Sequence, residues 1–183
     1  MKLFQKVLMA SEDVQAYVRS GKYFDSADDE QPISDGACVV AGDLVANDAY
    51  PTVKDFNVRK LGLAKAQTDK VVFVDYVGVS EADVVGVKYR VGDKTYGYDA
   101  PAGTVVRYRV PQVGDMFWLG ADNFVSAPSV GQFAAPTASD TRLTAGASEV
   151  EGATNVKIEA VQDIITGMVN DGKKYLCTVV SVA

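Results

Sequence analysis

Valine dominates the apolar residues of this chain, and that excess constrains its fold more than any other feature. The 183-residue sequence contains 30 valines, more than its leucines and isoleucines together. β-Branched valine favours strands because its side chain packs well on a pleated surface. The valines fall in short runs between glycine, proline and aspartate residues, which are typical of turns. The pattern predicts a mainly β protein built as a single compact barrel or sandwich.

The strand pattern recurs from Gly36 to the end of the chain. The candidate strands are residues 37–45, 70–79, 84–91, 104–110, 115–119, 156–168 and 174–182. Asn170-Asp171-Gly172 separates the last two, and Asp-Gly supplies the positive φ angles of a hairpin turn. We therefore expect these two strands to pair as a closing hairpin. Residues 158–169 also keep a helix-like spacing, but the alternation that begins at Val156 favours a strand.

The first 35 residues differ from the rest. Ser11 is a candidate N-cap, and Val14, Tyr17 and Val18 follow at helical spacing, with Gly21 as a stop. This predicts one short helix. An acidic run at 25–30 then indicates an exposed linker.

These features predict two regions within a single-domain chain. Residues 1–35 form an N-terminal arm with the short helix and the acidic linker. Residues 36–183 form the β domain. Within it, residues 126–148 are rich in Ala, Pro and Thr, and we expect a long loop there, either ordered by a neighbouring molecule or a plain surface excursion.

The residue inventory argues against catalysis. The chain has no histidine, so it lacks the commonest proton shuttle and metal ligand. It also lacks a phosphate-binding glycine loop, a dinucleotide-binding glycine motif and a CxxC pair. A spatial pair of carboxylates for glycoside cleavage remains open, because such a pair leaves no sequence spacing. We expect no enzyme activity, no cofactor and no metal, and the run 25–30 does not match a calcium loop.

Charge and hydropathy constrain the partners. The formal net charge of −6 opposes general nucleic-acid binding. No apolar run reaches the roughly 20 residues that a membrane-spanning helix needs. Gln5 and Lys6 interrupt the apolar start of the chain, so we do not expect a secretory signal. Cys38 and Cys177 lie in apolar strand-like runs, which favours buried thiols over a disulfide.

Two similar segments carry the candidate partner-binding residues. Residues 87–91 and 106–110 repeat a Val-basic-Tyr-Arg-Val pattern, each with a Gly-Asp pair after it. If both are strands, period-two alternation places four cations on one sheet face: Lys88, Arg90, Arg107 and Arg109. This face either docks an acidic partner surface or is balanced by nearby carboxylates.

The single tryptophan allows two interpretations. Trp118 lies between Phe117 and Leu119, with Phe124 and Phe133 nearby. These aromatic residues could form a platform for sugars, but burial of Trp118 in the core is the favoured interpretation.

The chain resembles the small β-rich structural proteins of tailed-phage heads, in particular capsid decoration (cement) proteins. The resemblance lies in residues 32–40 after an extended arm, the segment 113–122, the Ala/Pro/Thr-rich loop and the closing hairpin that ends at 179–182. It implies a non-enzymatic virion protein that binds the major capsid protein or other virion subunits in many copies, as a homo-oligomer that is often a trimer. Assembly would take place in the host cytoplasm.

Other functions remain open at this point. A tail-tube, connector or head-fibre component would have the same general composition. A carbohydrate-binding or adhesin-like β module would present an exposed aromatic platform at Trp118. A secreted binding module would carry an upstream export signal or a Cys38–Cys177 disulfide.

Overall fold

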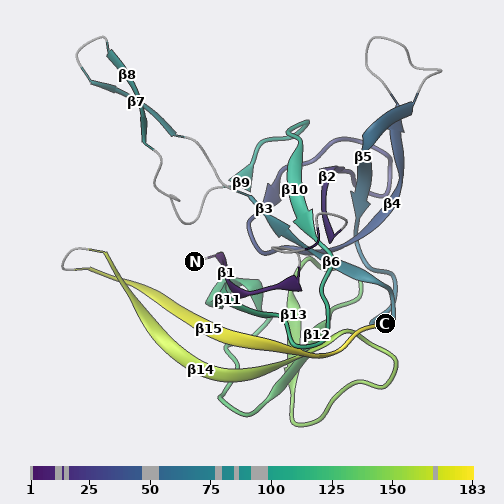
Figure 1. Ribbon diagram of the computed structural model, residues 1–183, viewed down its shortest axis with the longest axis vertical. Coiled ribbons are helices and arrows are strands. Elements are labelled where there is room, and N and C mark those ends of the chain that lie inside the picture. The colour runs from purple at the N-terminus through teal and green to yellow at the C-terminus, as the bar shows by residue number, and fades with distance from the viewer. Residues whose placement is uncertain are drawn as a thin grey trace.

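The computed structural model describes residues 2–10, 14, 17–46, 54–76, 80–84, 87–91, 99–166 and 169–183. The protein is mainly β, as the sequence predicts. Its strands form a closed barrel, a six-stranded sheet and two small two-stranded sheets (Figure 1). The expectation of a single barrel or sandwich is therefore too simple, because the barrel is only one part of the fold.

The barrel closes in the strand order β10-β2-β5-β4-β6. Its strands are β2 (Val18–Tyr23), β4 (Cys38–Ala46), β5 (Lys54–Gly62), β6 (Val71–Asp75) and β10 (Val106–Arg109). β2 and β5 are parallel, and the other neighbours are antiparallel. Apolar side chains, among them Val39, Leu61 and Tyr108, cluster within it.

The six-stranded sheet is antiparallel and has the order β1-β11-β15-β14-β12-β13. Its strands are β1 (Phe4–Leu8), β11 (Met116–Gly120), β12 (Phe133–Pro136), β13 (Leu143–Gly146), β14 (Asn155–Thr166) and β15 (Val169–Ser181). The two small sheets pair β3 (Ile33–Ser34) with β9 (Asp99–Ala100) and β7 (Ser80–Val84) with β8 (Val87–Val91). A 3-10 turn, η3 (Ala121–Asn123), follows β11.

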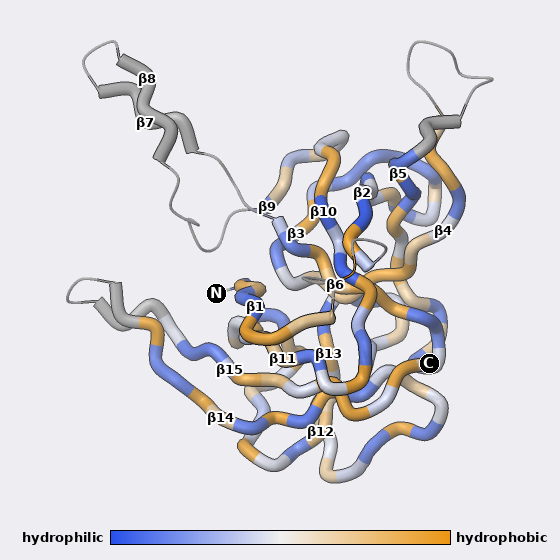
Figure 2. Tube along the Cα trace, viewed as in Figure 1, coloured by the Kyte–Doolittle hydropathy of each residue, from blue (hydrophilic) through white to orange (hydrophobic). Residues whose placement is uncertain are grey.

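Strand β6 and the first residues of β4 join the barrel to the sheet, because they are buried on both faces. Along β6, Val72 and Val74 belong to the barrel cluster, while Val71 and Phe73 belong to the cluster beneath the six-stranded sheet. Figure 2 shows the apolar chain around β6 between the two parts. A strand buried on both faces reads as a continuous apolar run, as Val-Val-Phe-Val does here. The two cores are thus continuous through shared strands.

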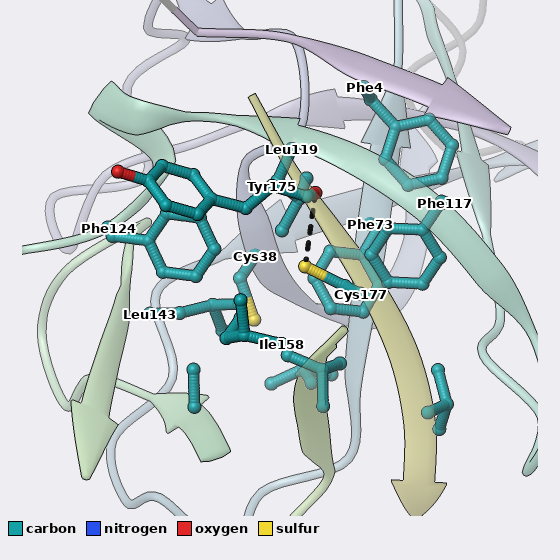
Figure 3. Close-up of a cluster of buried hydrophobic side chains, with 14 of the residues drawn as sticks. Phe4, Cys38, Phe73, Phe117, Leu119, Phe124, Leu143, Ile158, Tyr175 and Cys177 are labelled. Atoms are coloured by element: carbon teal, nitrogen blue, oxygen red, sulfur yellow. Dashed lines mark hydrogen bonds between the residues drawn. The ribbon is translucent and has the colours of Figure 1, made fainter. Parts of the chain in front are cut away.

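Aromatic rings fill the core beneath the sheet. Phe117 lies between Phe4 and Phe73, with ring centroids 5.0 and 4.9 Å away (Figure 3). The Phe124 and Tyr175 rings meet edge to face at 5.5 Å. Such pairs add about 0.5–1.5 kcal/mol each beyond the burial of their area.

The predicted N-terminal arm is wrong, because the first 35 residues contribute to both cores. Leu3, Phe4 and Met9 are at most 2% exposed, and Ile33 lies in the barrel cluster. The acidic run is a closed turn rather than a linker: the Asp25 carboxylate accepts hydrogen bonds from the backbone N–H groups of Ala27 and Asp29. These hydrogen bonds lower the pKa of Asp25.

The predicted helix near Gly21 is also wrong. Residues 18–23 form β2, and no α-helix occurs among the described residues; 11–13, 15 and 16 lie outside them. Gly21 does not stop a helix but lies inside the barrel, where a Cβ would be 2.6 Å from the Leu61 Cγ. Tertiary packing outweighs the helical spacing here.

The segment 126–148 is not a plain loop. It contains the hairpin of β12 and β13, which extends the sheet beside β14. Ala134, Ala135 and Leu143 are buried. Alanine lets the strands lie close to the core but gives little strand signal in a sequence.

The closing hairpin is confirmed, but its turn is not where Asp-Gly predicts it. β14 and β15 pair from Asn155 to Thr166, and Thr166 lies opposite Val169. The register shifts farther along, where Ile164 faces Gly172 and Ile165 faces Asn170. Gly172 has a φ of 118°, so its positive φ serves an irregularity within β15.

Candidate functional site

The four predicted cations do not share one sheet face. Lys88 and Arg90 lie on β8, which pairs with β7, whereas Arg107 and Arg109 lie on β10 of the barrel. On the β7–β8 backbone, Lys88 is opposite Asp83 and Arg90 is opposite Glu81. The structure does not describe the side chains of Lys88 and Arg90. The expected single basic face is therefore wrong, because the similar segments belong to different sheets.

Arg107 and Arg109 converge on one carboxylate. The Arg109 Nε lies 2.7 Å from the Asp75 Oδ2, and the Arg107 Nη2 lies 3.0 Å from the same oxygen. The Arg109 side chain is 2% exposed and that of Arg107 is 45% exposed. Arg109 is thus part of the interior, and Arg107 alone of this pair presents a surface charge. The balance of these charges by a nearby carboxylate, one of the two sequence interpretations, holds for this pair.

Trp118 is not in the core, contrary to the favoured interpretation. Phe117 and Leu119 are fully buried, and Trp118 lies on the opposite face of β11, partly exposed. The Lys174 Nζ lies 4.8 Å from the centre of the indole ring and 3.2 Å from the Gln5 Oε1. Residues 116–119 are all apolar, so the sequence itself does not indicate which of the two faces of this strand is buried.

Trp118 belongs to a larger apolar surface, which we call the outer sheet face. Its apolar members come from three adjacent strands, β1, β11 and β15: Leu8, Met116, Trp118 and Leu176. Leu8 pairs with Met116, and Trp118 pairs with Leu176, so each pair shares one side of the sheet. Leu8 is 64% exposed, and the other three are partly exposed. Sequence reasoning missed Leu8 and Leu176 because strand pairing alone brings them together.

The thiols offer no reactive site. Cys38 and Cys177 are both free and buried beneath the sheet, as the sequence predicts (Figure 3). Burial raises the pKa of each thiol well above its usual range. A buried neutral thiol is a poor nucleophile and a poor metal ligand.

Among the described carboxyl groups, those of Asp25, Asp69 and Asp140 have a clearly shifted pKa, and in each the pKa is lowered. A hollow of about 540 Å³ is lined by residues that include Lys2, Asp122, Asp140 and Arg142. The Arg142 guanidinium lowers the pKa of Asp140 through a hydrogen bond of 2.6 Å. A glycosidase acid needs the opposite shift. Within the described residues, no cluster of three or more acidic or cysteine side chains is placed to hold a metal ion.

In the part of the chain that the structure describes, no helix has the length and apolar character to cross a membrane. Comparisons with protein families, curated proteins and solved structures found no match to this chain.

Proposed function

We propose that this protein is a non-enzymatic structural protein of a virion, a capsid decoration protein that binds and stabilises an assembled phage head. The outer sheet face carries this proposal: it places partly exposed apolar side chains from three adjacent strands on one surface. Aromatic residues and methionine are enriched in the buried centres of protein interfaces. Trp118 and Met116 are residues of that kind.

The scaffold beneath this face suits a binding role. Phe117, Leu119 and Cys177 lie on the inner side of the same strands and are fully buried. Close packing of that kind fixes the strands from which the outer side chains project. A rigid face loses little conformational entropy when a partner covers it.

Arg107 supplies a charge for the same role. Asp75 offers one carboxylate to two guanidinium groups, and the Arg107 side chain is 45% exposed. It can therefore approach an acidic group of a capsid subunit. The proposed partners are the major capsid protein and further copies of this chain, with a trimer as the assembly to test. Many copies would multiply modest contacts through avidity.

A carbohydrate-binding module is the second candidate, because Trp118 is partly exposed. A sugar would stack on the indole ring. Lys174 lies over one side of that ring, so a sugar would have to use the other side or displace the ammonium group. This requirement makes the capsid role the better supported of the two.

The experiment compares substitutions at two apolar residues that are equally exposed. Leu8 and Val113 are both 64% exposed, but only Leu8 lies on the outer sheet face. The protein is co-expressed with the major capsid protein encoded nearest to its own gene, and shells are isolated by sedimentation. We expect the wild type and Val113→Glu to sediment with the shells and to raise their disruption temperature. Leu8→Glu should lose at least tenfold in occupancy.

The absence of the wild-type protein from shells would reject the capsid role. Equal occupancy of both variants would instead reject the outer sheet face as the surface that contacts the shell. Binding of the wild type to a glycan array, lost in Trp118→Ala, would favour the carbohydrate module instead.

A further inference from the structure

Lys174 is a cation at the border of the outer sheet face. It lies on β15 two residues before Leu176, so the two side chains project from the same side of the strand. Leu176 pairs with Trp118 of β11, and Lys174 is therefore next to the apolar members of the face. Among the residues that the structure describes, no aspartate or glutamate forms an ion pair with Lys174.

Two neutral neighbours orient the Lys174 ammonium group. Its Nζ lies 3.2 Å from the Gln5 Oε1 and 4.8 Å from the centre of the Trp118 ring. Gln5 and Trp118 are register partners on β1 and β11, so these contacts connect three adjacent strands of the sheet (Figure 1). An ammonium group has three N–H donors, and Gln5 accepts from one of them. Donors therefore remain for an acceptor that a partner supplies.

A second lysine on the same side of the sheet has a different environment. Lys157 lies opposite Thr178, which in turn lies opposite Met116 of the outer sheet face. The Lys157 Nζ lies 3.4 Å from the Glu159 Oε1. The charge of Lys157 is thus compensated within the protein, whereas both contacts of Lys174 are with neutral groups.

A partner that covers the outer sheet face must also accommodate the charge of Lys174. Apolar surface placed over an ammonium group would displace water without replacing its hydrogen bonds, which is unfavourable. A carboxylate of the partner would replace them with a charge-assisted hydrogen bond. Apolar residues beside that carboxylate would cover Trp118 and Leu176, as in the buried centres of protein interfaces.

We propose that the outer sheet face binds a segment of the capsid protein in which one acidic residue lies among apolar ones, and that its carboxylate pairs with the Lys174 ammonium group. This inference rests on the proposed function, because the capsid protein is the partner of the face. The recognised feature is a single carboxylate in apolar surroundings.

The test compares Lys174→Glu with Lys173→Glu in the sedimentation assay with co-expressed shells. Lys173 is the matched control, because it is exposed and projects from the other side of β15. The two variants also have the same composition and net charge. We expect the wild type and Lys173→Glu to sediment equally with the shells and Lys174→Glu to lose at least tenfold in occupancy. Lys174→Met, which keeps an unbranched side chain without the charge, should bind more weakly than the wild type, and its binding should depend less on salt.

Carbodiimide crosslinking of the decorated shells identifies the acidic partner, because the reagent joins a lysine amine to a carboxylate in contact with it. Mass spectrometry should find Lys174 linked to an aspartate or glutamate of the capsid protein. Circular dichroism checks the fold of each variant, and Lys174→Met decides the question if Lys174→Glu does not fold.

Wild-type occupancy and salt dependence in Lys174→Met would overturn the inference, as would crosslinks to the capsid protein from Lys173 but not from Lys174. In both cases the wild type is still bound to shells, so the proposed function stands. The absence of the wild type from shells would reject the proposed function and this inference with it.

Discussion

The Arg109 guanidinium and the Asp75 carboxylate form an ion pair inside the protein. The Arg109 Nε and the Asp75 Oδ2 are 2.7 Å apart, and the two side chains are only 2% and 5% exposed. Arg107 reaches the same oxygen from the surface. A buried ion pair contributes little net stability, but removing one partner leaves a charge without compensation. Loss of the Asp75 charge should therefore destabilise the protein much more than loss of the Arg107 charge.

The substitution Asp75→Asn should lower the free energy of unfolding by about 3–5 kcal/mol, because the buried Arg109 guanidinium would lose the charge of the carboxylate 2.7 Å away. Arg107→Gln should cost less than about 1 kcal/mol, since an ion pair with an exposed partner is screened by solvent. Urea denaturation of the three proteins measures both values. Equal effects of the two substitutions would contradict the assignment of Asp75 to a buried pair with Arg109.

The substitution Phe4→Ala tests whether the N-terminus belongs to the core. Phe4 is fully buried, and its ring centroid lies 5.0 Å from that of Phe117. Its truncation should lower the free energy of unfolding by about 3–5 kcal/mol. Val7→Ala on the same strand is the control, because Val7 is 54% exposed. If both variants unfold at the same urea concentration, the first residues act as an arm after all.

The valine-rich strands were predictable from sequence because each carries its own apolar pattern. β6 is the plainest case: Val71, Val72, Phe73 and Val74 are buried on both sides. β4, β10, β11 and β15 also follow from local runs of apolar or alternating residues. β2 and β5 did not, since Gly21 and Arg59 occupy positions that only a closed barrel explains.

The candidate site was less predictable than the fold, because its residues are brought together by pairing between strands that are distant in the chain. Alternation places Arg107 and Arg109 on one side of β10, but only the register with β6 brings Asp75 to them. Similar sequences at 87–91 and 106–110 do not imply neighbouring strands. The outer sheet face combines Leu8 with Met116, residues far apart in the chain, and long-range pairing leaves no local signal.

The substitution Gly21→Ala should destabilise the barrel. A Cβ at this position would lie 2.6 Å from the Leu61 Cγ and 2.9 Å from the Arg59 carbonyl oxygen. Overpacking of this kind costs about 1–3 kcal/mol. Gly62→Ala is the matched control on β5, because no atom lies within 4 Å of its added Cβ. Thermal unfolding should show a lower Tm for Gly21→Ala alone. An unchanged Tm would mean that β2 and β5 can separate without cost.

The buried thiols predict a loss of stability at alkaline pH. Burial raises the pKa of Cys38 and Cys177 in the folded protein, whereas in the unfolded chain a thiol ionises near its ordinary pKa of about 8.5. Above that pH the unfolded state releases protons that the folded state retains. The free energy of unfolding must then fall as pH rises, by up to about 1.4 kcal/mol per pH unit for each thiol.

Urea denaturation under reducing conditions between about pH 8 and 9 measures this slope, because most tyrosines, with an ordinary pKa of about 10, are still protonated there. Cys38→Ala and Cys177→Ala should each lower the stability at pH 7 through the cavity they create. Each should also flatten the alkaline slope, because one ionising thiol is removed from the unfolded state. The change in slope distinguishes proton linkage from packing, since a cavity lowers stability equally at every pH. Identical slopes in the wild type and both variants would show that the two thiols ionise as readily in the folded protein as in the unfolded chain.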